Sequence, residues 1–262
     1  MKIWIITMED PLYTTDFIKD IIRDRHKDIA GLTIAKGGRL KIGKKRSKST
    51  YLLSLLLIMG PYHFLKNSVK TLNFKIRKKL TEFSPAIPSN GLEEFAAEYD
   101  IKVDYTSNPN QEGYLEKLRN EEPDVIINQS QFIVKKPLLD IPKIGMLNRH
   151  NALLPKNRGR LTPFWVAYKG EEETGVSIHF VDEGIDSGPI VVQKRFLVSK
   201  DDTFNSIVEK NYEIASKAML EALDLLEKGY TSFQENDDQN ATYNSVPTLR
   251  DAIKFSFNKI KL

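Results

Sequence analysis

Residues 123–150 carry the sequence PDVIINQSQFIVKKPLLDIPKIGMLNRH, and this stretch decides the fold class. It contains two short apolar runs, Val125–Asn128 and Ile144–Asn148, which follow prolines at Pro123 and Pro142. Short apolar runs bounded in this way indicate strands buried inside a sheet. We therefore predict two buried strands, the second of which ends in polar residues.

The same alternation of apolar runs and helical patterns extends toward the N-terminus. We expect strands at 2–7, 29–35 and 101–105, and helices at 15–25 (with Thr15 as the N-cap), 91–99 and 110–120. Strands separated by helical segments indicate right-handed crossovers and a largely parallel sheet. The predicted fold class is α/β, with a largely parallel central sheet and flanking helices.

The pattern changes after residue 150. Two strands, at 174–180 and 190–198, are separated by a turn rich in Asp and Gly, and a long helix with an Ala/Leu stripe follows at 203–228. Near the C-terminus, Thr248 and Asp251 have the spacing of residues that cap a last helix. We expect the chain to end in a short extension beyond the sheet.

Composition limits the possible chemistry. The chain has 262 residues and no cysteine, which excludes a disulfide scaffold, a Cys-ligated metal and a thiol nucleophile. The longest apolar stretch, residues 51–65, is shorter than the about 20 residues that span a bilayer. The apolar start at residues 1–7 is too short for a signal peptide. We expect a cytoplasmic protein.

Charge is distributed unevenly. The segment 36–80 holds 13 Lys and Arg residues and no Asp or Glu, whereas the rest of the chain carries an excess of nine acidic residues. Three interpretations remain open: a solvated basic loop, a contact for an anionic substrate, or attachment to an anionic membrane surface with residues 51–65 half inserted. A helix that is apolar on nearly every side, as Leu52–Met59 would be, favours burial.

Two familiar motifs fit poorly. The stretch Gly38–Lys45 nearly matches a phosphate-binding loop, but Lys45 stands where the magnesium-binding hydroxyl is required. There is no G-x-G-x-x-G, so a dinucleotide-binding fingerprint is absent. Three acidic residues, Asp182, Glu183 and Asp186, lie close together without further oxygen ligands, and no metal is expected.

The most informative motifs lie between residues 148 and 188. They are Asn148-x-His150, Leu153-Leu154-Pro155, Arg158-Gly159, Glu173-Thr-Gly-Val-x-Ile-His179 and Asp182-Glu-Gly-x-Asp186-x-Gly188. Their order and spacing resemble the formyltransferases that move a formyl group from N10-formyltetrahydrofolate to an amine. The resemblance is strongest over 123–200 and implies a Rossmann-like formyltransferase fold. It implies a catalytic domain at 1–202, with a basic and apolar insertion at 36–80, and a C-terminal helix and short extension at 203–262.

The resemblance also implies a catalytic trio of Asn148, His150 and Asp186. Asn148 and a protonated His150 could donate hydrogen bonds to the oxyanion of a tetrahedral intermediate. Asp186 would keep His150 protonated and oriented, and could help to move a proton through water. Asn148 and His150 are two apart on an extended segment, so their side chains should point to the same side.

The co-substrate implied by the resemblance is N10-formyltetrahydrofolate, held by backbone groups of two loops. The matching residues are Gln131, Phe132, Ile133, Val134, Val181, Asp182 and Glu183. His179 and Thr174 also match motif positions, and we expect them to support the site without touching the reacting atoms. A pteridine suits an apolar slot with a few amide contacts.

The acceptor is expected to be a small amine, most plausibly a nucleotide-linked amino sugar. The loop at residues 8–14 has two acids and no glycine, which disfavours the phosphate of glycinamide ribonucleotide. Only 34 residues follow the helix at 203–228, too few for the C-terminal domain of methionyl-tRNA formyltransferase. That tRNA enzyme, a formyltetrahydrofolate hydrolase and a non-catalytic folate-binding protein remain alternatives. A homodimer could form through residues 51–65 or 243–262.

Overall fold

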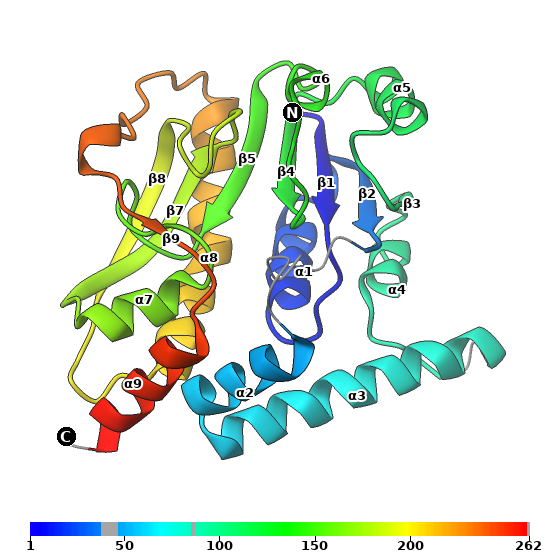
Figure 1. Cartoon of the computed structure of the whole chain (residues 1–262). Helices are drawn as coiled ribbons and strands as arrows, with labels where there is room; N and C mark the ends of the chain where they lie inside the picture. Colours follow the sequence, from blue (N-terminus) through cyan, green and yellow to red (C-terminus); the bar gives the residue numbers. More distant parts are fainter. Residues whose placement is uncertain (38–46, 85–86, 261–262) are drawn as a thin grey trace.

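The computed structural model describes residues 1–37, 47–84 and 87–260, and within them a seven-stranded sheet organises the chain (Figure 1). The strand order is β3-β2-β1-β4-β5-β7-β8. The strands are β1 Ile3–Thr7, β2 Ile29–Ala35, β3 Val103–Thr106, β4 Val125–Gln129, β5 Gly145–His150, β7 Glu173–Phe180 and β8 Ile190–Leu197. The pairs from β3 to β5 are parallel, whereas β7 pairs antiparallel with both β5 and β8. The predicted α/β fold class is confirmed.

Helices cover both faces of this sheet. The apolar residues of β1 alternate between the faces: Ile3 and Ile5 join α1 (Thr14–Arg25), α4 (Leu92–Ala97) and α8 (Phe204–Glu227). Trp4 and Ile6 join α5 (Glu112–Glu121) and α6 (Lys136–Leu139) on the other face. A strand flanked by helices on both sides has to be apolar throughout. All five residues of β1 are buried, which explains why its sequence, IWIIT, is apolar up to the final threonine.

The C-terminal part packs back onto the body. A two-residue strand β6 (Arg158–Gly159) pairs with β9 (Tyr243–Asn244), and α7 (Thr162–Lys169) follows β6. A short 3-10 helix lies at Asp238–Asn240, and α9 spans Leu249–Ile260. Thr248 and Asp251 cap α9 reciprocally, as predicted. The domain boundary at residue 202 stays a prediction, and α8 beyond it contributes to the same core as the sheet.

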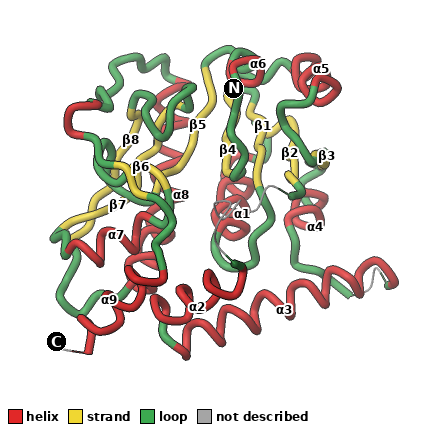
Figure 2. The backbone as a smooth tube through the Cα atoms, viewed as in Figure 1, coloured by secondary structure: helices red, strands yellow, loops and turns green. Residues whose placement is uncertain are grey.

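The remaining helices, α2 (Lys48–Met59) and α3 (Pro61–Phe83), form a hairpin at one end of the molecule with α9 (Figure 2). No helix in the described part of the chain is both long and apolar enough to cross a membrane. The helix predicted to be buried at Leu52–Met59 is buried only in part: Ser54 and Ile58 are buried, whereas Leu52 and Leu53 are exposed. Within the described residues α2 packs against α9, α3 and α8, which together cover only part of its surface.

The start of α1 and the basic segment 36–80 differ from what the sequence predicts. The predicted N-cap Thr15 lies inside α1, which begins at Thr14, and its buried Oγ1 has no hydrogen-bond partner among the described residues. Tyr13 occupies the N-cap position instead. The near match to a phosphate-binding loop at Gly38–Lys45 lies outside the described residues. The segment from Lys48 to Leu80 is helical, so this part of the basic segment is not a loop.

Candidate active site

A cavity of about 660 Å³ lies beside the ends of β4 and β5. Its walls come from the segment after β4, the loop between β7 and β8, the turn after β6, and single residues of α2 and of the segment after β9. All the residues predicted to bind folate line it: Gln131, Phe132, Ile133, Val134, Val181, Asp182 and Glu183. Asn148, His179 and Asp186 line it as well. The structure thus brings two loops separated by some fifty residues of sequence to one cavity.

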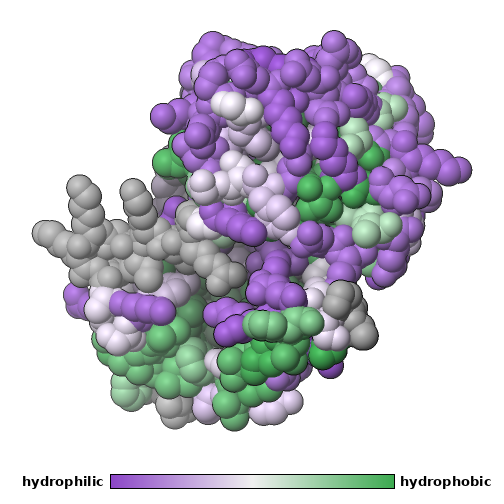
Figure 3. Space-filling view, turned by 90° about the vertical axis from the view of Figure 1, so that its right-hand side faces the viewer, coloured by the Kyte–Doolittle hydropathy of each residue, from purple (hydrophilic) through white to green (hydrophobic). Residues whose placement is uncertain are grey.

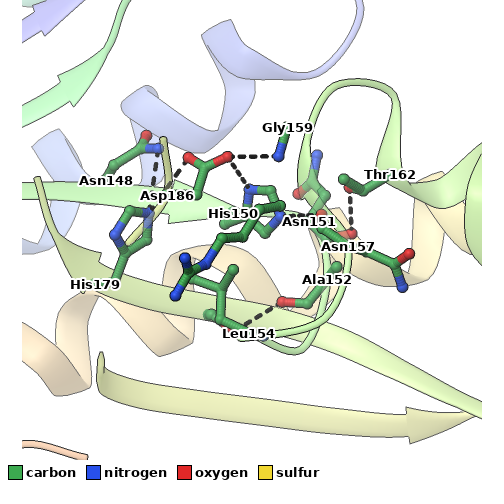
Figure 4. Close-up of polar contacts among 12 residues, drawn as sticks. Asn148, His150, Asn151, Ala152, Leu154, Asn157, Gly159, Thr162, His179 and Asp186 are labelled. Carbon is green, nitrogen blue, oxygen red and sulfur yellow. Dashed lines mark hydrogen bonds and ion pairs between the residues drawn. The ribbon is translucent and has the colours of Figure 1, made fainter. Parts of the chain in front are cut away.

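The predicted catalytic trio is also brought together (Figure 4). Asn148 and His150 lie on β5, and Asp186 reaches toward them from the β7–β8 loop. Oδ2 of Asp186 lies 3.5 Å from Nδ1 of His150 and accepts a 2.8 Å hydrogen bond from the backbone N–H of Gly159. Asp186 has a φ of +50°, a left-handed conformation that aspartate adopts more readily than most residues. This conformation and the Gly159 N–H fix the carboxylate beside the histidine.

His150 lies behind Asp186 and does not face the cavity. Its side chain is buried, and Nε2 lies 2.8 Å from the backbone oxygen of Asn157. Both ring nitrogens therefore face oxygens, Nδ1 the carboxylate of Asp186 and Nε2 the backbone oxygen of Asn157. The expectation that His150 donates directly to an oxyanion stays a prediction, since in this arrangement its two ring nitrogens face Asp186 and the Asn157 oxygen. Its contact is with Asp186, and Asp186 is the member of the pair that faces the cavity.

The side-chain amide of Asn148 has a defined orientation. Nε2 of Gln129 donates a 2.7 Å hydrogen bond to Oδ1 of Asn148, so Nδ2 of Asn148 must point the other way. That nitrogen lies 3.5 Å from Nε2 of His179. Nδ1 of His179 donates to the backbone oxygen of Phe180 at 2.7 Å, which leaves Nε2 of a neutral ring as an acceptor. An amide N–H of Asn148 is thereby presented at the cavity wall.

Gln129 was missed by the sequence analysis. Its own amide is oriented by Arg149, whose Nε donates to Oε1 of Gln129 at 3.0 Å. Arg149 is buried, stacks over the ring of Tyr212 and donates to the Tyr212 hydroxyl at 2.9 Å. The only signal in the sequence was a pair of amide residues, Asn128 and Gln129, directly after a buried apolar run. Their contact with β5 depends on which strands are neighbours, which local sequence does not reveal.

The two expected supporting residues behave differently. His179 pairs with Asn148 across β5 and β7, and its Nε2 lies 3.8 Å from Oδ1 of Asp186. Thr174 lies at the other end of β7, pairs with Phe196 of β8, and its buried hydroxyl has no partner among the described residues. The expectation for Thr174 was wrong, because five residues along a strand are about 17 Å.

A comparison of the sequence with models of protein families identifies the family to which this chain belongs. The family model described as "Formyl transferase" matches residues 69–223. The chain belongs to the formyl transferase family. The family predicted from the motifs is thereby confirmed, and the match includes both loops of the cavity and all three residues of the trio.

Two curated members of the formyl transferase family illustrate the sequence similarity. The methionyl-tRNA formyltransferase of Kosmotoga olearia is 33% identical over 168 residues, which are 64% of this chain and 54% of the relative. The methionyl-tRNA formyltransferase of Wolbachia pipientis subsp. Culex pipiens is 36% identical over 151 residues, 56% of this chain and 50% of the relative. The chain spans about half the length of the curated relatives it matches.

Solved structures of formyl transferases share the fold. Glycinamide ribonucleotide transformylase 1 from Symbiobacterium toebii superposes with a TM-score of 0.60 at 15% identity, over 90% of this chain and 94% of that one. An N-formyltransferase from Helicobacter canadensis in complex with folinic acid and dTDP-3-aminofucose has a TM-score of 0.58 at 17% identity. The superposition includes 94% of this chain and 71% of the Helicobacter canadensis chain. At these identities the likeness establishes the fold.

The C-terminal segment supports the site in this formyl transferase family member. Nδ2 of Asn236 donates to the backbone oxygens of Asp186 and Gly188, both at 2.9 Å. The fully buried Arg158 holds Asn236 in turn, because its guanidinium donates to the backbone and side-chain oxygens of Asn236 and to the Tyr243 hydroxyl. The hydrogen bonds of Asn236, which Arg158 holds in place, therefore fix the loop that carries Asp186.

The acidic and histidine side chains around the cavity were also compared with the arrangement that a metal ion requires. Within residues 1–37, 47–84 and 87–260, no group of three or more His, Asp or Glu side chains is arranged to hold a metal ion. The acidic residues of the β7–β8 loop are used within the loop: Oδ1 of Asp182 accepts from the Ser187 hydroxyl at 2.7 Å and from the Gly184 N–H at 3.0 Å. The polar groups available at the cavity wall are those of the chain itself.

The buried His179 makes the stability of the fold depend on pH. Burial lowers the pKa of His179 to about 4, although the nearby Asp186 carboxylate opposes this shift. An unfolded histidine has a pKa near 6.5, so from about pH 6.5 down to about pH 4 only the unfolded chain binds this proton, and stability falls with the pH. Between about pH 7 and pH 5 this group should cost about 2 kcal/mol of unfolding free energy. Urea denaturation should show this loss in the wild type and a smaller one in His179→Gln; equal losses would contradict the assignment.

Proposed function

We propose that this chain transfers a formyl group from N10-formyltetrahydrofolate to the primary amine of an acceptor. One observation carries the proposal: Asn148 and Asp186 face the same cavity that is lined by the two loops expected to bind folate. A cavity of about 660 Å³ is within the range of cofactor sites. Phe132, Ile133 and Val134 offer the pterin an apolar slot, and backbone groups of Val181–Glu183 offer it hydrogen bonds.

The reaction begins when the neutral acceptor amine attacks the formyl carbon of the co-substrate. A C–N bond forms, the carbonyl oxygen becomes an oxyanion and the attacking nitrogen becomes cationic. Nδ2 of Asn148 donates a hydrogen bond to that oxygen, in the orientation that Gln129 imposes. The carboxylate of Asp186, held by His150 and by the Gly159 N–H, accepts a proton from the attacking nitrogen through a water molecule.

Collapse of the intermediate completes the transfer. The bond between the formyl carbon and N10 breaks, and N10 takes up the proton that passed through Asp186, giving tetrahydrofolate and the formylated amine. In this scheme His150 acts on Asp186 rather than on the oxyanion. The His150 ring and the Gly159 N–H hold the Asp186 carboxylate in position between turnovers.

The names of the sequence relatives support methionyl-tRNA as the acceptor more than they support the amino sugar predicted from the sequence. One structural observation favours the amino sugar as a second candidate. Lys19, Lys70 and Arg77 line a separate cavity of about 240 Å³ beside Pro11, together with a single carboxylate, that of Asp16. The excess of positive charge there suits the diphosphate of a nucleotide-linked sugar.

The acceptor is identified by measuring tetrahydrofolate release. The purified chain is incubated with N10-formyltetrahydrofolate and, separately, with methionyl-tRNA, with nucleotide-linked amino sugars or with no acceptor. We expect release that depends on one of the two acceptor classes, with formylated product detected by mass spectrometry. Release without any acceptor would indicate hydrolysis, and binding of the folate without release would indicate a non-catalytic protein. Either result would overturn the proposed transfer.

A further inference from the structure

Helix α3 presents its apolar residues away from the protein. None of its 23 residues is buried. The large apolar residues are exposed by 42% to 78%: Tyr62, Leu65, Val69, Leu72, Ile76, Leu80 and Phe83. At 3.6 residues per turn these seven lie within an arc of about 80° and form a continuous stripe along a helix about 35 Å long. We call this stripe, defined by these residues, the outer stripe.

The opposite side of α3 holds the helix against the body. The half-buried residues of α3 recur on that side and are His63, Phe64, Asn67, Thr71, Phe74, Lys78 and Thr81. Lys78 forms an ion pair with Glu9, and the Thr81 hydroxyl donates to the backbone oxygen of Ile87 at 2.6 Å. At its flank, Lys70 donates to the backbone oxygen of Leu12 at 3.1 Å. These contacts fix the rotation of α3 so that the outer stripe points to solvent.

Such an arrangement is the reverse of a surface helix in a globular protein, which turns its apolar stripe toward the core. Two leucines of α2, Leu52 and Leu53, are exposed as well. Figure 3 shows hydrophobic residues gathered along the lower edge of the molecule, the edge that α2 and α3 form in Figure 1. An exposed apolar surface of this length marks a binding surface.

Cations border the outer stripe on both sides. By helical geometry Lys66 lies along one border, and Lys75 and Lys79 lie along the other. Lys70 and Arg77 are on the same side as Lys66, and they also line the 240 Å³ cavity. The hairpin from Lys48 to Phe83 contains seven Lys and Arg residues and a single acid, Glu82. No carboxylate of the described residues forms an ion pair with Lys66, Lys75, Arg77 or Lys79. An apolar stripe bordered by lysine and arginine is the pattern of a helix that lies in a membrane interface.

We propose that the α2–α3 hairpin docks this protein on an anionic lipid surface, with the outer stripe in contact with the acyl chains and the bordering cations among the headgroups. A second copy of the same helix fits less well, because packing stripe to stripe would bring the two sets of cations together. Nucleic acid would match the cations but would leave the apolar stripe in water. A lipid surface with negative headgroups matches both features.

The docking surface adjoins the candidate active site. Tyr51 of α2 lines the 660 Å³ cavity, while Leu52 and Leu53 follow it on the exposed side of the same helix. A protein docked through α2 and α3 would therefore hold its cavity close to the lipid headgroups.

The test measures binding of the full chain to vesicles, without any assay of activity. We expect the protein to sediment with vesicles of phosphatidylglycerol and phosphatidylcholine, to bind pure phosphatidylcholine at least about tenfold less, and to be released by about 1 M salt. Leu72→Ser with Ile76→Ser should reduce the partition coefficient by at least about tenfold. Lys75→Gln with Lys79→Gln should reduce it by a similar factor on anionic vesicles only.

The control variant is Leu197→Ser, which removes an even more exposed leucine at the end of β8, and it should bind as the wild type does. In a second measurement, lipids brominated on their acyl chains should quench Leu72→Trp fluorescence and leave Leu197→Trp unaffected. Circular dichroism should be the same for all variants, since the altered side chains are exposed. The proposal is overturned if the stripe variants bind as the wild type does or quenching is absent. The proposal is also overturned if the wild type does not bind vesicles and instead forms a dimer, while the outer-stripe variants are monomeric.

Discussion

Asp186→Asn and His150→Gln should each slow formyl transfer by about 10³-fold, within the range expected for loss of a proton-transfer group. Asparagine keeps the shape of Asp186 and can still accept the Gly159 N–H, so the loop should stay in place while the charge is lost. Glutamine at position 150 can still donate to the Asn157 oxygen but removes the ring that faces Asp186. Single-turnover measurements with saturating co-substrate isolate the chemical step.

The double variant separates a joint role from two independent ones. Because His150 acts through Asp186 in our scheme, the double variant should be little slower than Asp186→Asn alone. Matched controls are His26→Gln and Asp201→Asn, which alter residues far from the cavity and should leave the rate unchanged. Rates that multiply in the double variant, or singles that retain wild-type turnover, would contradict the proposed pair.

Arg158→Met should lower the free energy of unfolding by about 3 kcal/mol, among the largest single-residue effects expected for this chain. The guanidinium is fully buried and donates to Asn236, Tyr243 and Asp238. Methionine fills a similar volume but leaves the backbone oxygen of Asn236 and the Tyr243 hydroxyl without their donor. Urea denaturation followed by circular dichroism measures the change.

Arg160→Met is the matched control, because Arg160 lies two residues along and is exposed. Its effect on stability should stay below about 0.5 kcal/mol. A loss in Arg158→Met no larger than that of the control would show that the buried hydrogen bonds do not stabilise the fold. Since Asn236 also holds the backbone of Asp186, we expect Arg158→Met to impair formyl transfer under conditions in which it is still folded.

The sequence predicted the elements whose signal is local. The strands β1, β4 and β5 were found because buried strands between helices are continuous apolar runs, and the cap of α9 was found because Thr248 and Asp251 are three residues apart. The two-residue strands β6 and β9 were missed. They consist of a pairing between Arg158–Gly159 and Tyr243–Asn244, and no periodicity can develop over two residues.

The residues of the candidate site also fall into two groups: those that a sequence motif identifies and those whose role depends on the neighbouring strand. Asn148, His150 and Asp186 were found from motifs that a family shares, whereas Gln129 and Arg149 were not. Their roles arise because β4 and β5 are neighbours in the sheet, which places Gln129 beside Asn148. The orientation of the His150 ring could not be predicted from the sequence either. It depends on the backbone oxygen of Asn157, which lies in a loop without regular structure.

The residues that line the cavity come from two kinds of segment. Asn148, His179 and Asp186 stand on the sheet or on the loop between two of its strands, whereas Tyr51 and Val246 come from segments outside the sheet, before β3 and after β9. Tyr51 lies within α2 and Val246 precedes α9, and these two helices pack against each other. Substitutions in this pair of helices can therefore reshape one part of the cavity wall while the reacting groups keep their hydrogen bonds. Chimaeras that exchange α2 and α9 together would change which molecules enter without rebuilding the chemistry.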